Sequence, residues 1–274
     1  MALVEITRGS ARPPLYCVYA RPDDGFLYGA LAHRLGPEQP VYGLTATTPD
    51  GRLEPYLNFR ELAARCAREL RSVQPQGPYH IVGECLAGLP AFELAAQLRA
   101  DGDEVWLALI DAFRSGEPPL RSFVPSKAHS LLHRGCILGF HLLNLVRLPT
   151  RASYAAERGS RAWSKLRRRR SRADAAAAFQ SALTGHEPQR YGGRVILFRA
   201  KRLPSGLACG SDLGWAEVVD ELEIVPVPGY FTTAMSEPHV RVLAQKMRLM
   251  LDNDPAAAPA ARLVCAGAAS TFGR

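Results

Sequence analysis

One cysteine stands where a nucleophile is expected. The segment 83–87, Gly-Glu-Cys-Leu-Ala, follows an apolar run at 79–82 and precedes a helical pattern at 86–100. A strand, a sharp turn and a helix in this order form a nucleophile elbow, in which a glycine two residues before the nucleophile lets the turn close. The positive end of the helix is expected to lower the pKa of a thiol at Cys85, and the thiolate is the attacking species. The pattern predicts Cys85 as a nucleophile, and the alternative is a small buried residue at an ordinary turn.

The elements that must position this cysteine alternate along the chain. Short β-branched or aromatic runs alternate with longer helical patterns, which is typical of a parallel sheet covered by helices on both faces. Strands are predicted at 15–19, 41–44, 79–82, 105–110, 195–198 and 222–227, and helices at 26–35, 58–73, 86–100 and 239–251. Residues 114–190 contain helical stretches with Pro-rich joints, and an insertion of this size is more often a cap over a site than a loop.

We therefore predict one α/β domain over residues 1–252, with a helical lid insertion at about 114–190. The tail at 253–274 is rich in Ala, Pro and Gly without periodicity, and we expect it to be disordered.

The charge balance excludes a generally nucleic-acid-coating surface. The chain has 34 Lys and Arg against 26 Asp and Glu, a net charge of +8. Residues 151–172 hold nine basic side chains and one acid, so the rest of the chain is neutral and any electrostatic partner meets one short segment.

The cysteines and the apolar runs exclude further classes of protein. The six cysteines lie far apart with no C-x-x-C pair, which argues against a zinc ribbon or a disulfide framework and favours a reducing, cytoplasmic compartment. Cys66 falls on the apolar face of the helix predicted at 58–73 and is expected to be core. Neither a signal peptide nor a stretch long enough to span a membrane is apparent.

Beyond the elbow, the chain resembles the thioesterase family of nonribosomal peptide and polyketide synthases. The resemblance extends over about residues 14–251. The matching segments are 14–18, 40–44, 77–80, 91–95, 107–111, 193–200, 227–229 and 237–240. It implies an α/β-hydrolase fold, with a mostly parallel sheet, helices on both faces and a helical lid. It also implies an acyl or peptidyl carrier protein as partner, with the substrate on its phosphopantetheine arm. The sequence shows no Gly-rich phosphate loop, metal-ligand cluster or dinucleotide fingerprint, so we expect no other cofactor and no metal.

The resemblance assigns roles at matching positions. Cys85 stands in the serine slot of the family, and Asp111 matches the acid that orients the catalytic histidine. Backbone N–H groups of Arg21 and Leu86 match the oxyanion hole. The loop around Arg21 departs from the family, because the H-P-x-G-G pattern is replaced by Tyr-Ala-Arg-Pro-Asp at 19–23 and proline has no N–H.

A second departure removes the general base. Alignment through the segment 227–240 places Phe231 where the family has its histidine. His239 matches a different position eight residues further on. The lid histidines His129, His133 and His141 could reach inward.

Cysteine chemistry tolerates this loss better than serine chemistry would. A thiolate at Cys85 can attack a carrier-bound thioester unaided, because the product is another thioester and the leaving group is a thiolate. The resemblance thus implies an acyl or aminoacyl transferase or hydrolase of natural-product biosynthesis that works through an acyl-Cys85 intermediate. The alternative is a non-catalytic binding or scaffold protein of a synthase assembly line.

The basic segment lies inside the predicted lid. Carrier proteins are typically acidic, so we expect a carrier-docking surface there. Its residues are Lys165, Arg167, Arg168, Arg169 and Arg170. A solvated basic face, a peripheral membrane contact and a nucleic-acid contact are the alternatives, although no aromatic side chains interleave with the arginines as nucleic-acid binding would favour.

Overall fold

The computed structural model describes residues 2–9, 12–20, 27–46, 56–115, 126–147, 155, 159, 169–203, 206–231 and 233–254. These residues form one seven-stranded sheet in the order β1-β3-β2-β4-β5-β6-β7. The strands are β1 (Ala2–Thr7), β2 (Leu15–Val18), β3 (Val41–Thr45), β4 (Tyr79–Glu84), β5 (Val105–Ile110), β6 (Tyr191–Arg202) and β7 (Val219–Tyr230).

All neighbouring strands are parallel except β1, which pairs antiparallel with β3. The mostly parallel α/β sheet is therefore confirmed. The edge strand β1 was not predicted, because its six residues lack the continuous apolar run of a strand buried on both faces.

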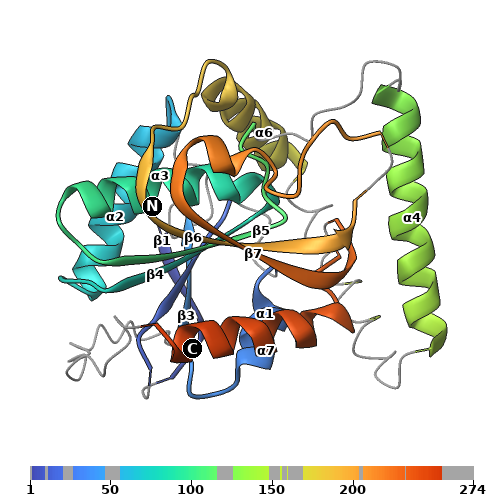
Figure 1. The fold of residues 1–274 in the computed structure, drawn as a ribbon, viewed down its shortest axis with the longest axis horizontal. Helices are drawn as coiled ribbons and strands as arrows, with labels where there is room; N and C mark the ends of the chain where they lie inside the picture. The colour runs from blue at the N-terminus through green and yellow to red at the C-terminus, as the bar shows by residue number, and fades with distance from the viewer. Residues whose placement is uncertain are drawn as a thin grey trace, which may run out of the picture.

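Helices cover both faces of the sheet, as predicted. One face carries α1 (Gly29–Leu35) and α7 (His239–Asp252), and the other carries α2 (Phe59–Val73), α3 (Gly88–Ala100) and α6 (Arg169–Leu183) (Figure 1). Successive residues of a strand point to opposite faces. Accordingly, Ile81 belongs to the hydrophobic cluster on the α3 side, and Val82 belongs to the cluster on the α7 side.

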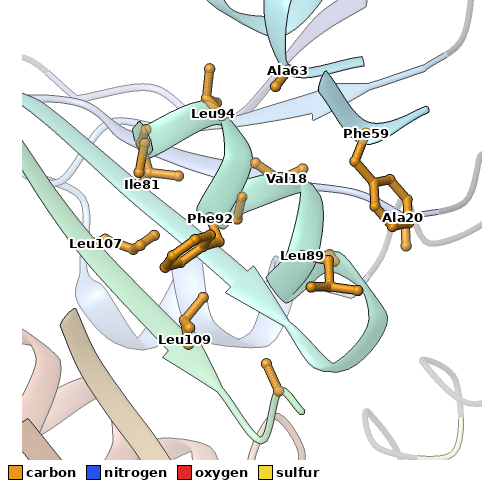
Figure 2. Packing of buried hydrophobic residues seen from close by; sticks show 14 of the residues in the cluster. Val18, Ala20, Phe59, Ala63, Ile81, Leu89, Phe92, Leu94, Leu107 and Leu109 are labelled. Carbon is orange, nitrogen blue, oxygen red and sulfur yellow. The ribbon is translucent and has the colours of Figure 1, made fainter. Parts of the chain in front are cut away.

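The helix that follows the elbow is buried along most of its length. Every residue from Gly88 to Ala95 in α3 is buried, which is typical of a helix covered by neighbours rather than facing solvent. Phe92 of α3 points toward Leu107 and Leu109 of β5, and Leu94 extends from the other side of the helix toward Ala63 of α2 (Figure 2). This packing gives the elbow a rigid base.

The segment predicted as a lid contains α4 (Ser126–Arg147) and α6, and no strand is present in its described residues. In Figure 1, α4 stands apart from the layered body, beyond the ends of the strands. In the part of the chain that the structure describes, no helix is long and apolar enough to cross a membrane. The tail predicted to be disordered lies outside the described residues after Asp254.

Candidate active site

The chain makes a sharp turn at Cys85, between β4 and α3. The backbone φ of Cys85 is +50°, a left-handed conformation that costs a non-glycine residue on the order of 1–3 kcal/mol. A Cβ at Gly83 would lie 2.6 Å from the Cβ of Ala91 and 2.7 Å from the carbonyl oxygen of Ala87. Only glycine fits at Gly83, and the turn holds the partly buried Cys85 at the carboxyl edge of the sheet.

Cys85 begins a 3-10 turn over Cys85–Ala87, which leads directly into α3. The first N–H groups of a helix have no helical acceptor and point out of its N-terminus. Leu86 lies in this turn, and its N–H stays the predicted oxyanion-hole donor. The other predicted donor, Arg21, lies outside the described residues.

A buried tyrosine joins the elbow to the neighbouring strand. The hydroxyl of Tyr28 accepts a hydrogen bond from the N–H of Glu84 (3.0 Å) and donates one to the carbonyl of Val18 (2.9 Å). Burial raises the pKa of Tyr28 well above its ordinary value, and the charges of nearby Cys17 and Glu84 raise it further, so the hydroxyl keeps its proton. Sequence reasoning missed Tyr28, since nothing in its local pattern distinguishes it from an ordinary core tyrosine.

Asp111 is held rigidly at the end of β5. Its side chain is fully buried and its φ is +46°. Its Oδ1 accepts a hydrogen bond from the N–H of Ala200 (2.7 Å), and its own N–H donates to the carbonyl of Phe198 (2.9 Å). Trp215 fixes the next residue, because its indole N–H donates to the carbonyl of Ala112 (2.8 Å). Asp111 is therefore part of the buried framework rather than a solvated carboxylate at a strand end.

The elbow and the Asp111 segment touch each other. A Cβ at Gly88 would lie 2.4 Å from the Cβ of Ala112, so the start of α3 packs directly on the residue after Asp111. The structure thus brings the two predicted side-chain residues, Cys85 and Asp111, to adjoining segments at one edge of the sheet.

Phe231 occupies an aromatic cluster beside these segments. It is 6% exposed, and its ring lies edge-on to Phe113 with centroids 5.2 Å apart. A second aromatic neighbour is His133 of α4, whose ring centroid lies 5.7 Å away. Its N–H donates to the carbonyl of Arg202 (3.0 Å), which fixes the backbone of this loop.

His239 supports the same loop from behind. Its Nδ1 lies 3.3 Å from Oγ1 of Thr233, and its ring stacks on Phe140 of α4 with centroids 5.0 Å apart. Gly229 has a φ of +106°, and a Cβ there would lie 2.3 Å from Nδ1 of His239. Burial lowers the pKa of His239, and Arg202 lowers it further, against the opposing effect of the Thr233 hydrogen bond.

The remaining cysteines differ from Cys85 in their surroundings. Cys17 and Cys66 are fully buried, and burial raises the pKa of Cys66 to about 12, in agreement with its predicted place in the core. Cys136 on α4 is exposed, and Cys209 is half-buried with a raised pKa. Among the described residues, no group of three or more His, Cys, Asp or Glu side chains is arranged to hold a metal ion.

The predicted carrier-docking residues fall mostly outside the described part of the chain. Lys165, Arg167 and Arg168 lie outside it. Arg169 and Arg170 form the first residues of α6, and only their backbone is described.

Comparison with known proteins identifies the family to which the elbow region is related. Residues 25–115, which include Cys85 and Asp111, match the family model described as Thioesterase domain. This region, about a third of the chain, is therefore similar to thioesterase domains. The chain is 32% identical over 120 residues to the Dimodular nonribosomal peptide synthase of Bacillus subtilis, an alignment that spans 43% of this chain and 5% of that protein. It is 26% identical over 214 residues to Enterobactin synthase component F of Escherichia coli, spanning 77% of this chain and 15% of that protein.

The curated relatives are thus far longer than the thioesterase-like chain. Solved structures share its fold. The NocB thioesterase domain, in covalent complex with a fluorophosphonate nocardicin G analog, superposes with a TM-score of 0.59 at 21% identity and covers 91% of this chain and 99% of that one. The four-domain nonribosomal peptide synthetase holo-AB3403 gives a TM-score of 0.65 at 22% identity, over 90% of this chain and 20% of that one. The predicted α/β-hydrolase fold is confirmed.

Proposed function

We propose that this chain transfers acyl or aminoacyl groups from the phosphopantetheine thioester of a carrier protein, through an acyl-Cys85 intermediate. The observation that carries the proposal is the left-handed turn at Cys85, which presents a partly buried thiol at the start of a helix. The match of residues 25–115 to the Thioesterase domain model, and the similarity to nonribosomal peptide synthases, support the class of substrate and partner.

The first half-reaction needs no histidine. The Cys85 thiolate attacks the thioester carbonyl carbon, the bond from that carbon to the pantetheine sulfur breaks, and the pantetheine thiolate leaves and takes a proton from water. One thioester replaces another, so the exchange is nearly thermoneutral. The N–H of Leu86 supports the charge that develops on the carbonyl oxygen.

The second half-reaction depends on the acceptor. A thiol acceptor can ionise by itself near neutral pH and attack the acyl-Cys85 carbon, whereas water, an alcohol or a protonated amine needs a base. We therefore expect transfer to a thiol to be faster than hydrolysis.

Intact-protein mass spectrometry tests the proposal with an acyl-loaded carrier protein and with Cys85→Ala. The wild-type chain should gain the mass of the acyl group, and the adduct should vanish on addition of a thiol acceptor. Cys85→Ala should gain none, whereas Cys136→Ser, which removes an exposed thiol on α4, should react as the wild type does. Unchanged activity in Cys85→Ala would rule out the covalent route.

The rival function is a non-catalytic scaffold. The buried Phe231 at the position of the family base favours it. A thiol-reactive probe separates the two in the Cys136→Ser background: a scaffold should show no selective labelling at Cys85 over Cys209, whereas the proposed enzyme should be labelled first at Cys85.

A further inference from the structure

We infer that His133, carried by the helix α4, supplies the base for the second half-reaction when the acceptor is water or an alcohol. The inference rests on the proposed acyl-Cys85 function, and it supplies the general base that neither the elbow nor Asp111 provides. A series of packing contacts connects the elbow to His133. Gly88 at the start of α3 packs on Ala112, and the next residue, Phe113, packs on Phe231. Phe231 in turn packs on His133. The imidazole thus lies at the carboxyl edge of the sheet, in the aromatic cluster next to the Asp111 segment.

The position of α4 is fixed by contacts along one face. His133, Phe140 and Asn144 are seven and four residues apart, a spacing that places them on the same side of a helix over about 16 Å. Phe140 stacks on His239, and the side-chain amide of the buried Asn144 donates to the carbonyl of Glu237 (2.7 Å).

The residue whose carbonyl Asn144 contacts, Glu237, is held by its own side chain. The carboxylate of Glu237 accepts hydrogen bonds from Arg34 of α1 (2.6 Å) and from Arg241 of α7 (2.8 Å). The loop after β7 therefore forms a fixed seat for α4, and an imidazole on the seated face is held at one place relative to the sheet.

Three other described histidines, His80, His186 and His239, contact groups away from Phe231. His80 is buried within β4 and lies 3.1 Å from Asp254, and His186 lies 3.4 Å from Glu93 on the α3 side of the sheet. His239 faces Thr233, whose hydroxyl also donates to the carbonyl of Tyr230 and accepts from its N–H. His239 is thus built into the support of the loop, whereas His133 comes from the helix that covers it.

The chemical step balances without a further reactant. The imidazole of His133 takes a proton from water as the water oxygen attacks the acyl carbon. The bond from that carbon to Sγ of Cys85 then breaks, the carboxylic acid is released, and the proton returns from the imidazolium to the thiolate. An alcohol acceptor follows the same path and yields an ester. A thiol acceptor ionises by itself and does not need the imidazole.

The experiment compares oxygen and thiol acceptors in His133→Phe, which keeps an aromatic ring against Phe231 and removes the base. The acyl adduct is first formed from an acyl-loaded carrier protein, and its decay is then followed by intact-protein mass spectrometry in buffer alone or with a small thiol. Hydrolysis should slow on the order of a hundredfold, the contribution of a positioned base, while decay by thiol transfer stays within about twofold. His141→Phe, on the same helix and in ring contact with Phe140, is the matched control and should decay as the wild type does.

A second variant distinguishes loss of the base from loss of packing. His133→Ala should also hold its adduct against water, and added imidazole should restore hydrolysis. Equal slowing with water and with thiol, no slowing with either, or no rescue by imidazole would each overturn the role of His133. Absence of any adduct in the wild-type chain would instead contradict the proposed acyl-Cys85 function, so the two failures are distinguishable.

Discussion

The two sides of the candidate site are built in different ways. On the sheet side, Cys85 and Asp111 both have left-handed backbones that the surrounding core enforces, through Gly83 packed on Ala91 and through Asp111 bonded to Ala200. On the lid side, the contacts that the described residues of α4 make with the body come from side chains along one face. The predicted nucleophile is thus positioned by the core, while anything that α4 contributes depends on surface contacts.

The two faces of α4 differ in burial. One face contacts the loop after β7, and Asn144 on it is buried. Large apolar side chains point to solvent elsewhere on the helix. They are Leu131, Leu132, Leu138, Leu142, Leu143, Leu145 and Val146. A helix that exposes so much of its described surface is expected to open at a lower free energy than the core strands.

The largest effect is expected on the sheet side, from Gly83→Ala. The added methyl would meet the Ala87 carbonyl and the Ala91 Cβ, neither of which can move away freely. We expect a loss of about 2–3 kcal/mol in the free energy of unfolding, measured by urea denaturation, together with loss of acyl-Cys85 formation. Gly192→Ala is the control, because the nearest atom to its Cβ is a carboxylate oxygen of Asp220 at 3.6 Å. Equal stability of the two variants would contradict the packed elbow.

Substitution of Asp111 should lower the free energy of unfolding nearly as much, by an amount that depends on the new side chain. Asp111→Ala leaves the buried N–H of Ala200 without this acceptor and puts alanine at a positive φ, so we expect a loss of about 1–3 kcal/mol in the free energy of unfolding. Asp111→Asn keeps an acceptor and a side chain that tolerates this backbone, and should lose less. Thermal unfolding of the two variants side by side checks the order, and an equal loss would mean that the charge, which both variants remove, holds the segment rather than the hydrogen bond.

On the lid side, Asn144→Leu should release α4 without unfolding the domain. The lost hydrogen bond to the Glu237 carbonyl contributes only about 0.5–1.5 kcal/mol. We expect faster amide hydrogen exchange confined to α4, with an unchanged urea midpoint. Leu138→Asn, at a side chain that is 60% exposed, should change neither. Faster exchange in the core strands as well would show that α4 and the sheet form one cooperative unit.

The smallest effect concerns pH and His239. Its pKa is lowered on folding, so the unfolded chain binds its proton more readily, and stability falls as the pH drops below the ordinary value of 6.5. Between about pH 7.5 and about pH 5.5, the urea midpoint should fall less in His239→Gln than in the wild type. His186, whose pKa is also lowered by burial, remains in both proteins and cancels from the comparison. An identical fall in both would show that His239 does not contribute to the pH dependence.

Much of the sheet could be predicted because buried parallel strands are continuous apolar runs. The strand predicted at 105–110 matches β5 residue for residue, and the helix predicted at 58–73 begins one residue early, at the capping residue Asn58. The predicted strands at 195–198 and 222–227 were too short, because β6 and β7 continue beyond the core with alternating exposed residues. Their polar ends have no apolar run to mark them.

The site was predictable where backbone geometry demands a particular residue and unpredictable where distant segments meet. Gly83 and Cys85 marked the elbow from their spacing alone. Tyr28 could not be assigned a role, because its hydroxyl joins Val18 to Glu84, which are far apart in the chain.

The sequence by itself determined the α/β class and the resemblance to thioesterases, because local pattern and short motifs carry that information. It also predicts a cysteine nucleophile, and a phenylalanine at the position of the family histidine. Only the tertiary structure decided which of the lid histidines meets that phenylalanine. His133 and Phe231 are separated by almost a hundred residues, and they become neighbours because α4 is seated on the loop that follows the last strand of the sheet.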